Sequence, residues 1–398
     1  MNEPLRVLIA GAGLGGLCLA QRLHQAGVDV LVLERDAGPY SRAQGHRVHI
    51  DQRGEDALRA CLPGPLFELY QATRGQPSER MMLINAEGAR LQEVPLPALP
   101  DGTSIIRTGR AVSRNTLREI LLGGLDGVVR FGKAFTRYEQ DGGGQVRAWF
   151  ADGTSESGDV LVGADGIGSA VRGQRLPQAR VEDLEIRWIG GKGPITGEIE
   201  RSLPDGLEHA FAAVTGMDPA MMIGYMRFEN QPRPTAEHLA PDVLLTDTGD
   251  FVMWAITVHR DRLDASDAHL PGPELHRRAL DLTADAHPAM RRIIERSWPE
   301  QTFHLSIGTT LPIPAWVSDH VTLLGDAVHA MPPSRGSGAN TALSDAADLA
   351  RHLITVQQGS STLLEAISAY ERAMIERGFA AVESSTSAIE AIARKIIR

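Results

Sequence analysis

The N-terminal segment combines three glycines at the spacing G-x-G-x-x-G with an acidic residue eighteen positions further on. In a nucleotide-binding turn the first glycine permits a tight bend, the second lets backbone N–H groups approach a pyrophosphate, and the third lets a helix pack closely on a strand. The acid can accept hydrogen bonds from the hydroxyls of an adenosine ribose. These residues are Gly11, Gly13, Gly16 and Glu34, with Leu14 and Gly15 inside the motif.

The elements around the glycines decide between a ligand site and a plain glycine-rich turn. Residues 6–10 ("RVLIA") predict a buried strand before the motif, and residues 28–34 ("VDVLVLE") predict a second strand that ends at the acid. A helix that starts inside the motif offers unpaired N–H donors to an anion. We therefore expect a dinucleotide site, although the motif does not separate FAD from NAD. Arg35 either lies over the adenine or is a surface charge.

Two distant segments repeat the pattern of a buried strand, a polar turn and a helix. Residues 159–172 ("DVLVGADGIGSAVR") contain Asp165 at the end of the strand. Residues 320–353 contain Asp326 at the same place, followed by a glycine-rich loop and a long helix that we expect to begin near Asn340. A loop that enters a helix N-terminus presents N–H donors to a group that gains negative charge.

With these three segments in this order, the chain resembles the class A flavoprotein monooxygenases of the para-hydroxybenzoate hydroxylase type, and especially the short tetracycline-inactivating flavin monooxygenases. The resemblance implies bound FAD, with Asp326 on its ribityl chain and with Arg114 and Asp51 near the flavin. Asp165 belongs to a motif that the family associates with both FAD and NADPH. Arg42 is either an NADPH contact or a surface arginine. The isoalloxazine ring would be lined by Gly336, Ser337, Gly338, Ala339 and Asn340, where the family often has Gln in place of the serine.

The resemblance also implies a reaction. NADPH or NADH would reduce the flavin, which would then react with O2 to form a C4a-hydroperoxide and transfer one oxygen atom to an aromatic or polyketide-like small molecule. No side chain stands out as a catalytic base, so the catalytic residues stay unknown. A flavin-dependent oxidase or reductase on the same fold, and a non-catalytic flavin-binding sensor, are the alternatives.

The expected fold is α/β, with a Rossmann-like FAD-binding domain interrupted by an antiparallel β-sheet substrate domain and followed by C-terminal helices. We assign residues 1–75, 100–180 and 300–360 to the FAD-binding domain and residues 76–99 and 181–299 to the substrate domain. Residues 361–398 form two amphipathic patterns, which predict two C-terminal helices that pack against both domains.

Period-two alternation in residues 221–228 and 251–259 predicts antiparallel strands in the substrate domain. Their methionines either fill a core or line a substrate cavity. Alternation places Phe251 and Met253 on one face and Trp254 on the other. The substrate candidates are Met222, Tyr225, Phe251, Met253 and Trp254.

Composition limits the remaining functions. The net charge of −10 argues against a nucleic-acid binder, and no run of about 18 apolar residues predicts a membrane span. Two cysteines do not make a disulfide framework, and Cys18 is expected in the core. His46 and His49 lack the companions of a metal site, and His329 is expected to serve packing or a turn. We expect a cytoplasmic monomer or homodimer without a metal.

Overall fold

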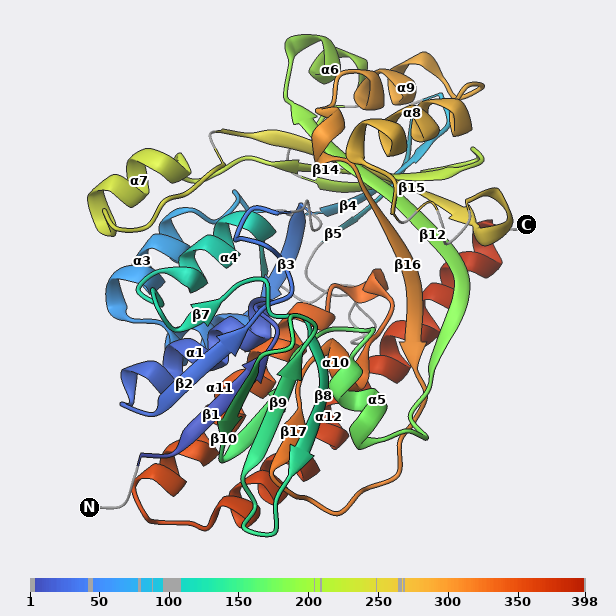
Figure 1. The fold of residues 1–398 in the computed structure, drawn as a ribbon. Helices are drawn as coiled ribbons and strands as arrows, with labels where there is room; N and C mark the ends of the chain where they lie inside the picture. Colours follow the sequence, from blue (N-terminus) through green and yellow to red (C-terminus); the bar gives the residue numbers. More distant parts are fainter. Residues whose placement is uncertain are drawn as a thin grey trace.

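The computed structural model describes residues 4–41, 46–77, 80–87, 89–95, 109–203, 205–207, 210–247, 249–263, 267 and 269–396. Its first layer contains a five-stranded parallel sheet in the order β17-β11-β1-β2-β7. The strands are nearly continuous apolar runs, as parallel strands covered on both faces require. Figure 1 shows this Rossmann-like sheet in the lower half of the molecule. The strands are β1 (Arg6–Ala10), β2 (Asp29–Leu33), β7 (Val129–Arg130), β11 (Val160–Gly163) and β17 (Val321–Leu323).

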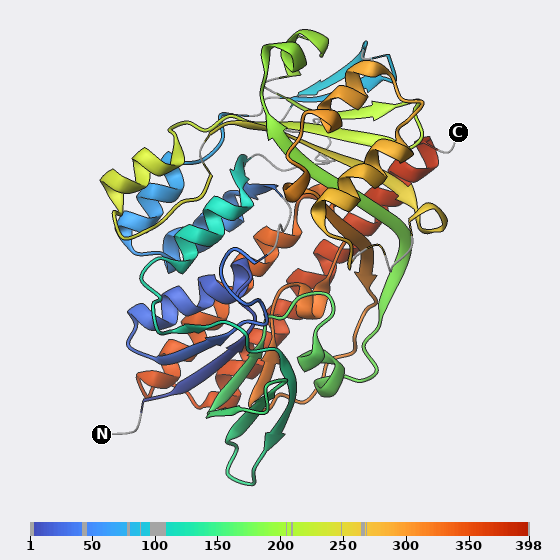
Figure 2. The same ribbon diagram turned by 45° about the horizontal axis from the view of Figure 1, so that its top comes forward.

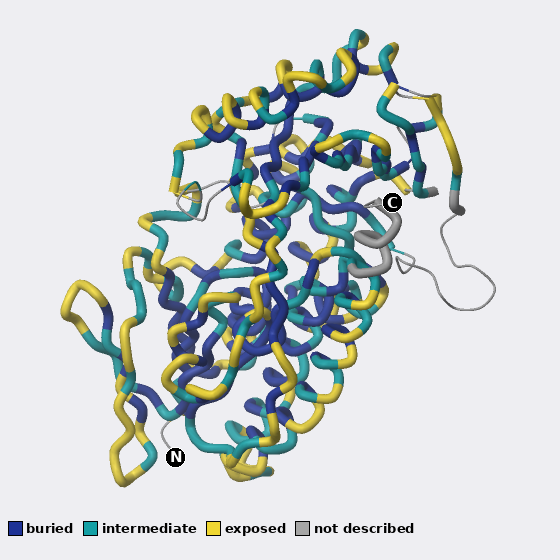
Figure 3. Tube along the Cα trace, turned by 90° about the vertical axis from the view of Figure 1, so that its right-hand side faces the viewer, coloured by how far each residue is buried: buried dark blue, intermediate teal, exposed yellow. Residues whose placement is uncertain are grey.

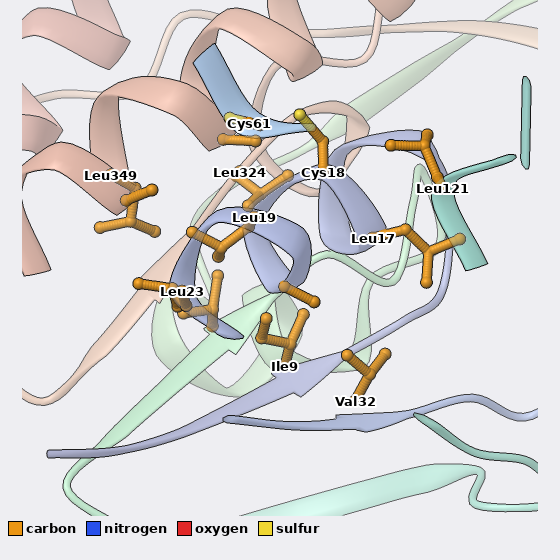
Figure 4. Close-up of a cluster of buried hydrophobic side chains, with 14 of the residues drawn as sticks. Ile9, Leu17, Cys18, Leu19, Leu23, Val32, Cys61, Leu121, Leu324 and Leu349 are labelled. Atoms are coloured by element: carbon orange, nitrogen blue, oxygen red, sulfur yellow. The ribbon is translucent and has the colours of Figure 1, made fainter. Parts of the chain in front are cut away.

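Helices α1 (Leu14–Gln25) and α11 (Gly338–Gln357) cover one face of this sheet, and Figure 4 shows the apolar side chains between them. Cys18 and Cys61 are fully buried in this cluster, so the expectation that Cys18 is a core residue is confirmed. A small antiparallel sheet covers the other face, and residues 141–145 form its hairpin turn. That sheet consists of β8 (Phe135–Gln140), β9 (Val146–Phe150) and β10 (Ser155–Gly158).

The second layer is a seven-stranded sheet in the order β16-β12-β15-β14-β13-β4-β5, which lies above the first layer in Figures 1 and 2. Its pairs are antiparallel except β13 and β4, which run parallel, so the expected antiparallel sheet needs this one correction. β16 pairs with β12, so pairing places it in this sheet although residues 300–360 were expected in the other domain. The strands are β4 (Arg80–Asn85), β5 (Arg90–Pro95), β12 (Val181–Pro194), β13 (Ala210–Thr215), β14 (Ala220–Met226), β15 (Phe251–His259) and β16 (Phe303–Thr310).

The two faces of the large sheet have different neighbours. The outer face packs against α6 (Gly197–Ser202), α8 (Gly272–Leu282) and α9 (Pro288–Glu295), and its core contains Tyr225 and Trp254. Phe251 and Met253 belong to a separate cluster with Ala111 of the first layer. The predicted alternation of Phe251 and Met253 against Trp254 is therefore confirmed. We call the face that bears Phe251 and Met253 the inner face.

The end of the chain forms one helix where the sequence favoured two. No glycine or proline interrupts residues 379–396, and Ser385 is buried within the continuous helix α12 (Leu363–Ile396).

Figure 3 shows the exposed positions on the outside of both layers. Within the described ranges we find no helix that is both long and apolar enough to cross a membrane. The remaining elements are α2 (Gln52–Cys61), α3 (Gly64–Ala72), α4 (Arg114–Leu122), α5 (Ala170–Arg175), α7 (Pro232–Leu239), α10 (Asp326–His329) and the paired strands β3 (Arg47–Asp51) and β6 (Gly109–Ser113).

The segment that precedes β15 is held against α4 by buried polar groups. Glu119 of α4 accepts hydrogen bonds from the backbone N–H of Thr246, at 2.9 Å, and from its hydroxyl. Burial raises the pKa of Glu119 to about 7, and nearby Asp247 adds to the effect, while the bonds from Thr246 oppose it. The folded protein therefore keeps a proton on Glu119 at pH values where the unfolded chain has released it.

We predict that the free energy of unfolding falls as the pH rises from 4.5 to about 7, because over this window the unfolded chain releases the Glu119 proton while the folded protein still holds it. A shift of this size corresponds to a loss on the order of 3 kcal/mol. Urea unfolding of the wild type and of E119Q at pH 5, 6, 7 and 8 measures it. E119Q should show a flatter profile, and equal slopes for both proteins would contradict the prediction.

Candidate functional site

The candidate site lies where β1, β11 and β17 end, because adjacent parallel strands bring their C-terminal ends to one edge of the sheet. Gly11 has φ +112°, and a Cβ on it would lie less than 3.0 Å from the carbonyl oxygen of Ala164. A Cβ on Gly16 would lie equally close to the carbonyl oxygen of Gly11. The protein itself therefore requires glycine at these two positions.

Gly13 differs, because no heavy atom of the described part of the chain lies within 4 Å of a Cβ built on it, and its φ of −77° suits any residue. The space beside Gly13 is open, so a pyrophosphate could approach the backbone there. Glu34 is buried next to this turn, and its Oε2 accepts a 2.7 Å hydrogen bond from the backbone N–H of Ala12. Arg35 is exposed. The turn and the acid thus have the arrangement that a dinucleotide needs.

Asp326 begins α10 and is exposed, although the three residues that follow it are buried. The surrounding protein raises the pKa of its carboxyl, and His329 and Arg114 nearby oppose this rise. A Cβ on Gly338 would lie 3.7 Å from Oδ1 of Asp326, so the carboxylate stands beside the start of α11. Ser337 provides no side-chain cap there. The first N–H groups of α11 therefore lack an intrahelical partner, and the helix begins near Asp326.

Asn340 has a different role from the one expected of a ring-lining side chain. Its Nδ2 donates to the carbonyl oxygens of His49, at 2.8 Å, and Gly336, at 2.9 Å, while its Oδ1 accepts from the N–H of Asp51 at 2.9 Å. The buried amide thus joins α11 to the end of β3. The Asn340 amide is thus fully used within the protein, and its predicted contact with the flavin ring stays a prediction for its backbone.

A buried charged network holds the Asp326 turn from behind. Asp345 of α11 accepts hydrogen bonds from Nε2 of His329 at 2.6 Å and from the N–H of Gly325 at 3.1 Å. Arg377 of α12 donates to its other oxygen at 2.8 and 3.1 Å. Burial lowers the pKa of His329, but the Asp345 carboxylate more than compensates, so the pKa is raised overall. The histidine that we expected to serve packing or a turn is one partner in this network.

Two predicted acids cap helices instead of standing free. Asp51 accepts from the N–H groups of Arg53 and Gly54 and pairs with the Arg53 guanidinium at 2.6 Å. Asp165 accepts from the hydroxyl of Ser169 at 2.5 Å and from the first N–H groups of α5. Arg114 lies at the first turn of α4, and its charge acts on Asp326. Arg42 lies outside the described residues.

Sequence reasoning missed two arginines that hold the loops of the site. Nε of Arg118 donates to the carbonyl oxygen of Ala12 inside the glycine motif at 3.1 Å. Arg172 donates to the carbonyl oxygen of Ala327 at 2.9 Å. Arg118 stands one helical turn after Arg114, so the helical period of α4 was a signal that could have found it.

A second missed group lies between the site and the inner face of the large sheet. Nε2 of His46 donates to the carbonyl oxygen of Gln301, and Phe303 packs edge-on against the ring. Burial and the nearby Lys192 lower the pKa of His46 to about 3. The imidazole is therefore neutral with its proton on Nε2, and its buried Nδ1 has no hydrogen-bond partner among the residues that the structure describes.

A family model described as an FAD binding domain matches residues 4–61 and 309–383. The dual O-methyltransferase/FAD-dependent monooxygenase CTB3 of Cercospora beticola is 29% identical, over 93% of this chain but 44% of its own length. This chain thus spans less than half of that relative. The FAD-dependent monooxygenase thnD of Trichoderma harzianum is 29% identical, with 96% of this chain and 92% of the relative covered. The crystal structure of a proposed FAD-containing monooxygenase from Photorhabdus luminescens subsp. laumondii TTO1 has a TM-score of 0.77 and 29% identity, covering 97% of this chain and 99% of that one.

We predict that G13A and G16A separate ligand binding from folding. G13A should cost no more than about 1 kcal/mol of stability, because only a helix N-cap changes, yet weaken FAD binding at least tenfold. G16A should destabilise the protein by roughly 3 kcal/mol, because its Cβ overlaps the carbonyl of Gly11. Urea unfolding and FAD titration of the apoprotein measure both effects. Normal FAD affinity in G13A would contradict the role assigned to the open space.

We also predict that R377M weakens FAD binding by about tenfold, because Asp345 loses two hydrogen bonds and holds the Gly325–Asp326 turn less firmly. R377K should restore part of the affinity. The control is R372M, which changes an exposed arginine on the same helix. FAD affinity that is equal in R377M and R372M would show that the network has no influence on the cofactor.

Proposed function

We propose that this chain is an FAD-dependent monooxygenase that inserts one atom of O2 into a small aromatic or polyketide-like molecule. The chain belongs to the class A flavoprotein monooxygenases. The observation that carries the proposal is the open space beside Gly13, a glycine that no neighbouring atom of the described residues requires. A pyrophosphate against the backbone gives a physical reason for glycine at that position.

The residues present suit FAD along its whole length. Glu34 would bind the adenosine ribose, and Asp326 would bind the ribityl chain. The first N–H groups of α11 would stabilise negative charge at the flavin ring when it is reduced. Bound FAD would supply electron transfer and oxygen transfer, while the protein orients it and excludes water. The proposed cofactor contacts are Gly11, Gly13, Leu14, Gly15, Gly16, Glu34, Arg35, Asp51, Arg114, Asp165, Asp326, Gly336, Gly338, Ala339 and Asn340.

The finer steps are part of the same proposal. NADPH or NADH would reduce the flavin, with Arg42 as a candidate contact, and oxygen transfer would proceed through a C4a-hydroperoxide. The division into an FAD-binding domain and a sheet domain would separate cofactor binding from substrate binding. Three substrate candidates, Met222, Phe251 and Met253, share the inner face of the large sheet. Tyr225 and Trp254 lie in the outer core, so we no longer assign them to the substrate.

Labelled oxygen tests the reaction. We predict that the FAD-loaded protein, supplied with NADPH or NADH and ¹⁸O2, forms a product with one labelled oxygen atom from a phenol, polyketide or alicyclic ketone in a substrate screen. Mass spectrometry measures the product, and the same assay under ¹⁶O2 is the control. Label found only in peroxide and water would indicate an oxidase. No consumption of the reductant with any compound would indicate a sensor.

A further inference from the structure

The inner face of the large sheet is apolar and incompletely covered. In the pairing of β13, β14 and β15, Phe211 stands opposite Gly224, which in turn stands opposite Met253. Phe211, Met222 and Met253 are half-buried, whereas the residues that alternate with them are buried in the outer core. A Cβ on Gly224 would lie 3.1 Å from the Phe211 ring and 3.4 Å from Cγ of Met253, so these two side chains meet over the glycine and form one apolar surface. Flat apolar surfaces with flexible methionines suit planar aromatic ligands.

Lys192 places a cation at the edge of this apolar face. It pairs in register with Met253, and Gly190, two residues away on the same face, packs on Phe303. The lysine is only 4% exposed. An ammonium group has three N–H donors. In the part of the chain that the structure describes, Oδ1 of Asp247 accepts one of them at 2.7 Å, and the Phe251 ring lies 4.5 Å from Nζ. The remaining donor capacity has no acceptor within that part of the protein.

Asp247 neutralises Lys192 and is itself fixed. The Ser113 hydroxyl donates to its carboxylate, and the Thr116 hydroxyl does so at 2.8 Å. Burial raises the pKa of Asp247, but Lys192 and these hydroxyls outweigh burial, so the pKa is lowered and the carboxylate stays ionised. The other charged or titratable groups nearby are Glu119, the neutral His46, and two arginines. The charge of Arg114 acts on His46 and on Asp326, and the Arg47 guanidinium lies 5.7 Å from the centre of the Phe211 ring.

We propose that Lys192 recognises the substrate by donating a hydrogen bond to a carbonyl or hydroxyl oxygen of a flat, uncharged aromatic molecule that lies on the inner face, an inference that rests on the proposed function. A neutral oxygen satisfies a buried donor without bringing further charge out of water. A carboxylate at Lys192 would add a second negative charge beside Asp247 and would lose its hydration there. The site therefore selects oxygenated aromatic ketones and phenols over aromatic acids.

The test compares two matched probes with the oxidised, FAD-loaded protein in the absence of reductant. The probes are 1,8-dihydroxyanthraquinone and its 3-carboxylate, and equilibrium dialysis measures their dissociation constants. Wild type should bind the neutral probe at least about tenfold more tightly than the acid, and K192M should lose about tenfold in affinity for the neutral probe, the size of effect that one buried hydrogen bond gives. K192R should retain most of the affinity.

D247N tests the charge argument separately, because it leaves Lys192 without its counter-charge. The carboxylate probe should then bind more tightly than it binds wild type, so that the preference for the neutral probe narrows or reverses. The matched control is K133M, which removes the lysine of an ion pair with Asp152 on the outside of the first layer. K133M should bind both probes as wild type does.

Unchanged binding of the neutral probe in FAD-loaded K192M would overturn the proposal, as would tighter binding of the acid than of the neutral probe by wild type. Failure of both probes to bind wild type would also overturn it. If K192M does not bind FAD, the dissociation constants measured with K192R and D247N test the proposal instead, because each variant keeps a polar group at its position. Failure of the wild type to bind FAD at all would instead contradict the proposed function.

Discussion

The close approach of the Gly11 turn to the end of β11 is the contact on which the rest of the site depends. A side chain at Gly11 would overlap the carbonyl of Ala164, and a side chain at Gly16 would overlap the carbonyl of Gly11. Together these contacts fix where α1 begins and hold Ala12 against Glu34. Since β11 also pairs with β17, the same edge positions the Asp326 turn. One steric constraint at the sheet edge therefore sets three separate parts of the site.

Buried polar side chains then join this edge to distant parts of the chain. Asn340 connects α11 to β3, and Asp345 connects α11 to α10 and α12. Such groups are costly to bury without partners, so each is bonded to more than one element. The start of α11 is consequently held from two sides, which keeps its N–H groups fixed in direction.

Much of the first layer was predictable, because local patterns determine it. The glycine spacing, two apolar strands and an acid are readable within 34 residues, and the alternation of β15 gave its two faces correctly. The role of Asn340 was not predictable, since its partner His49 is 291 residues away in sequence. Lys192 gave no signal either, because a single lysine among glycines is ordinarily exposed. Its burial depends on Asp247, which lies 55 residues later.

The continuous C-terminal helix also joins the two layers mechanically. Arg377 contacts the network behind Asp326, while Thr386, further along the same helix, lies 3.1 Å from the hydroxyl of Thr309 in β16. A continuous helix keeps two of its residues at a nearly fixed separation. A tilt of the large sheet away from the first layer would therefore strain the hydrogen bond at Thr309 or displace Arg377, which contacts the network behind the Asp326 turn. A change in the orientation of one layer relative to the other is therefore coupled to a shift of the Asp326 turn.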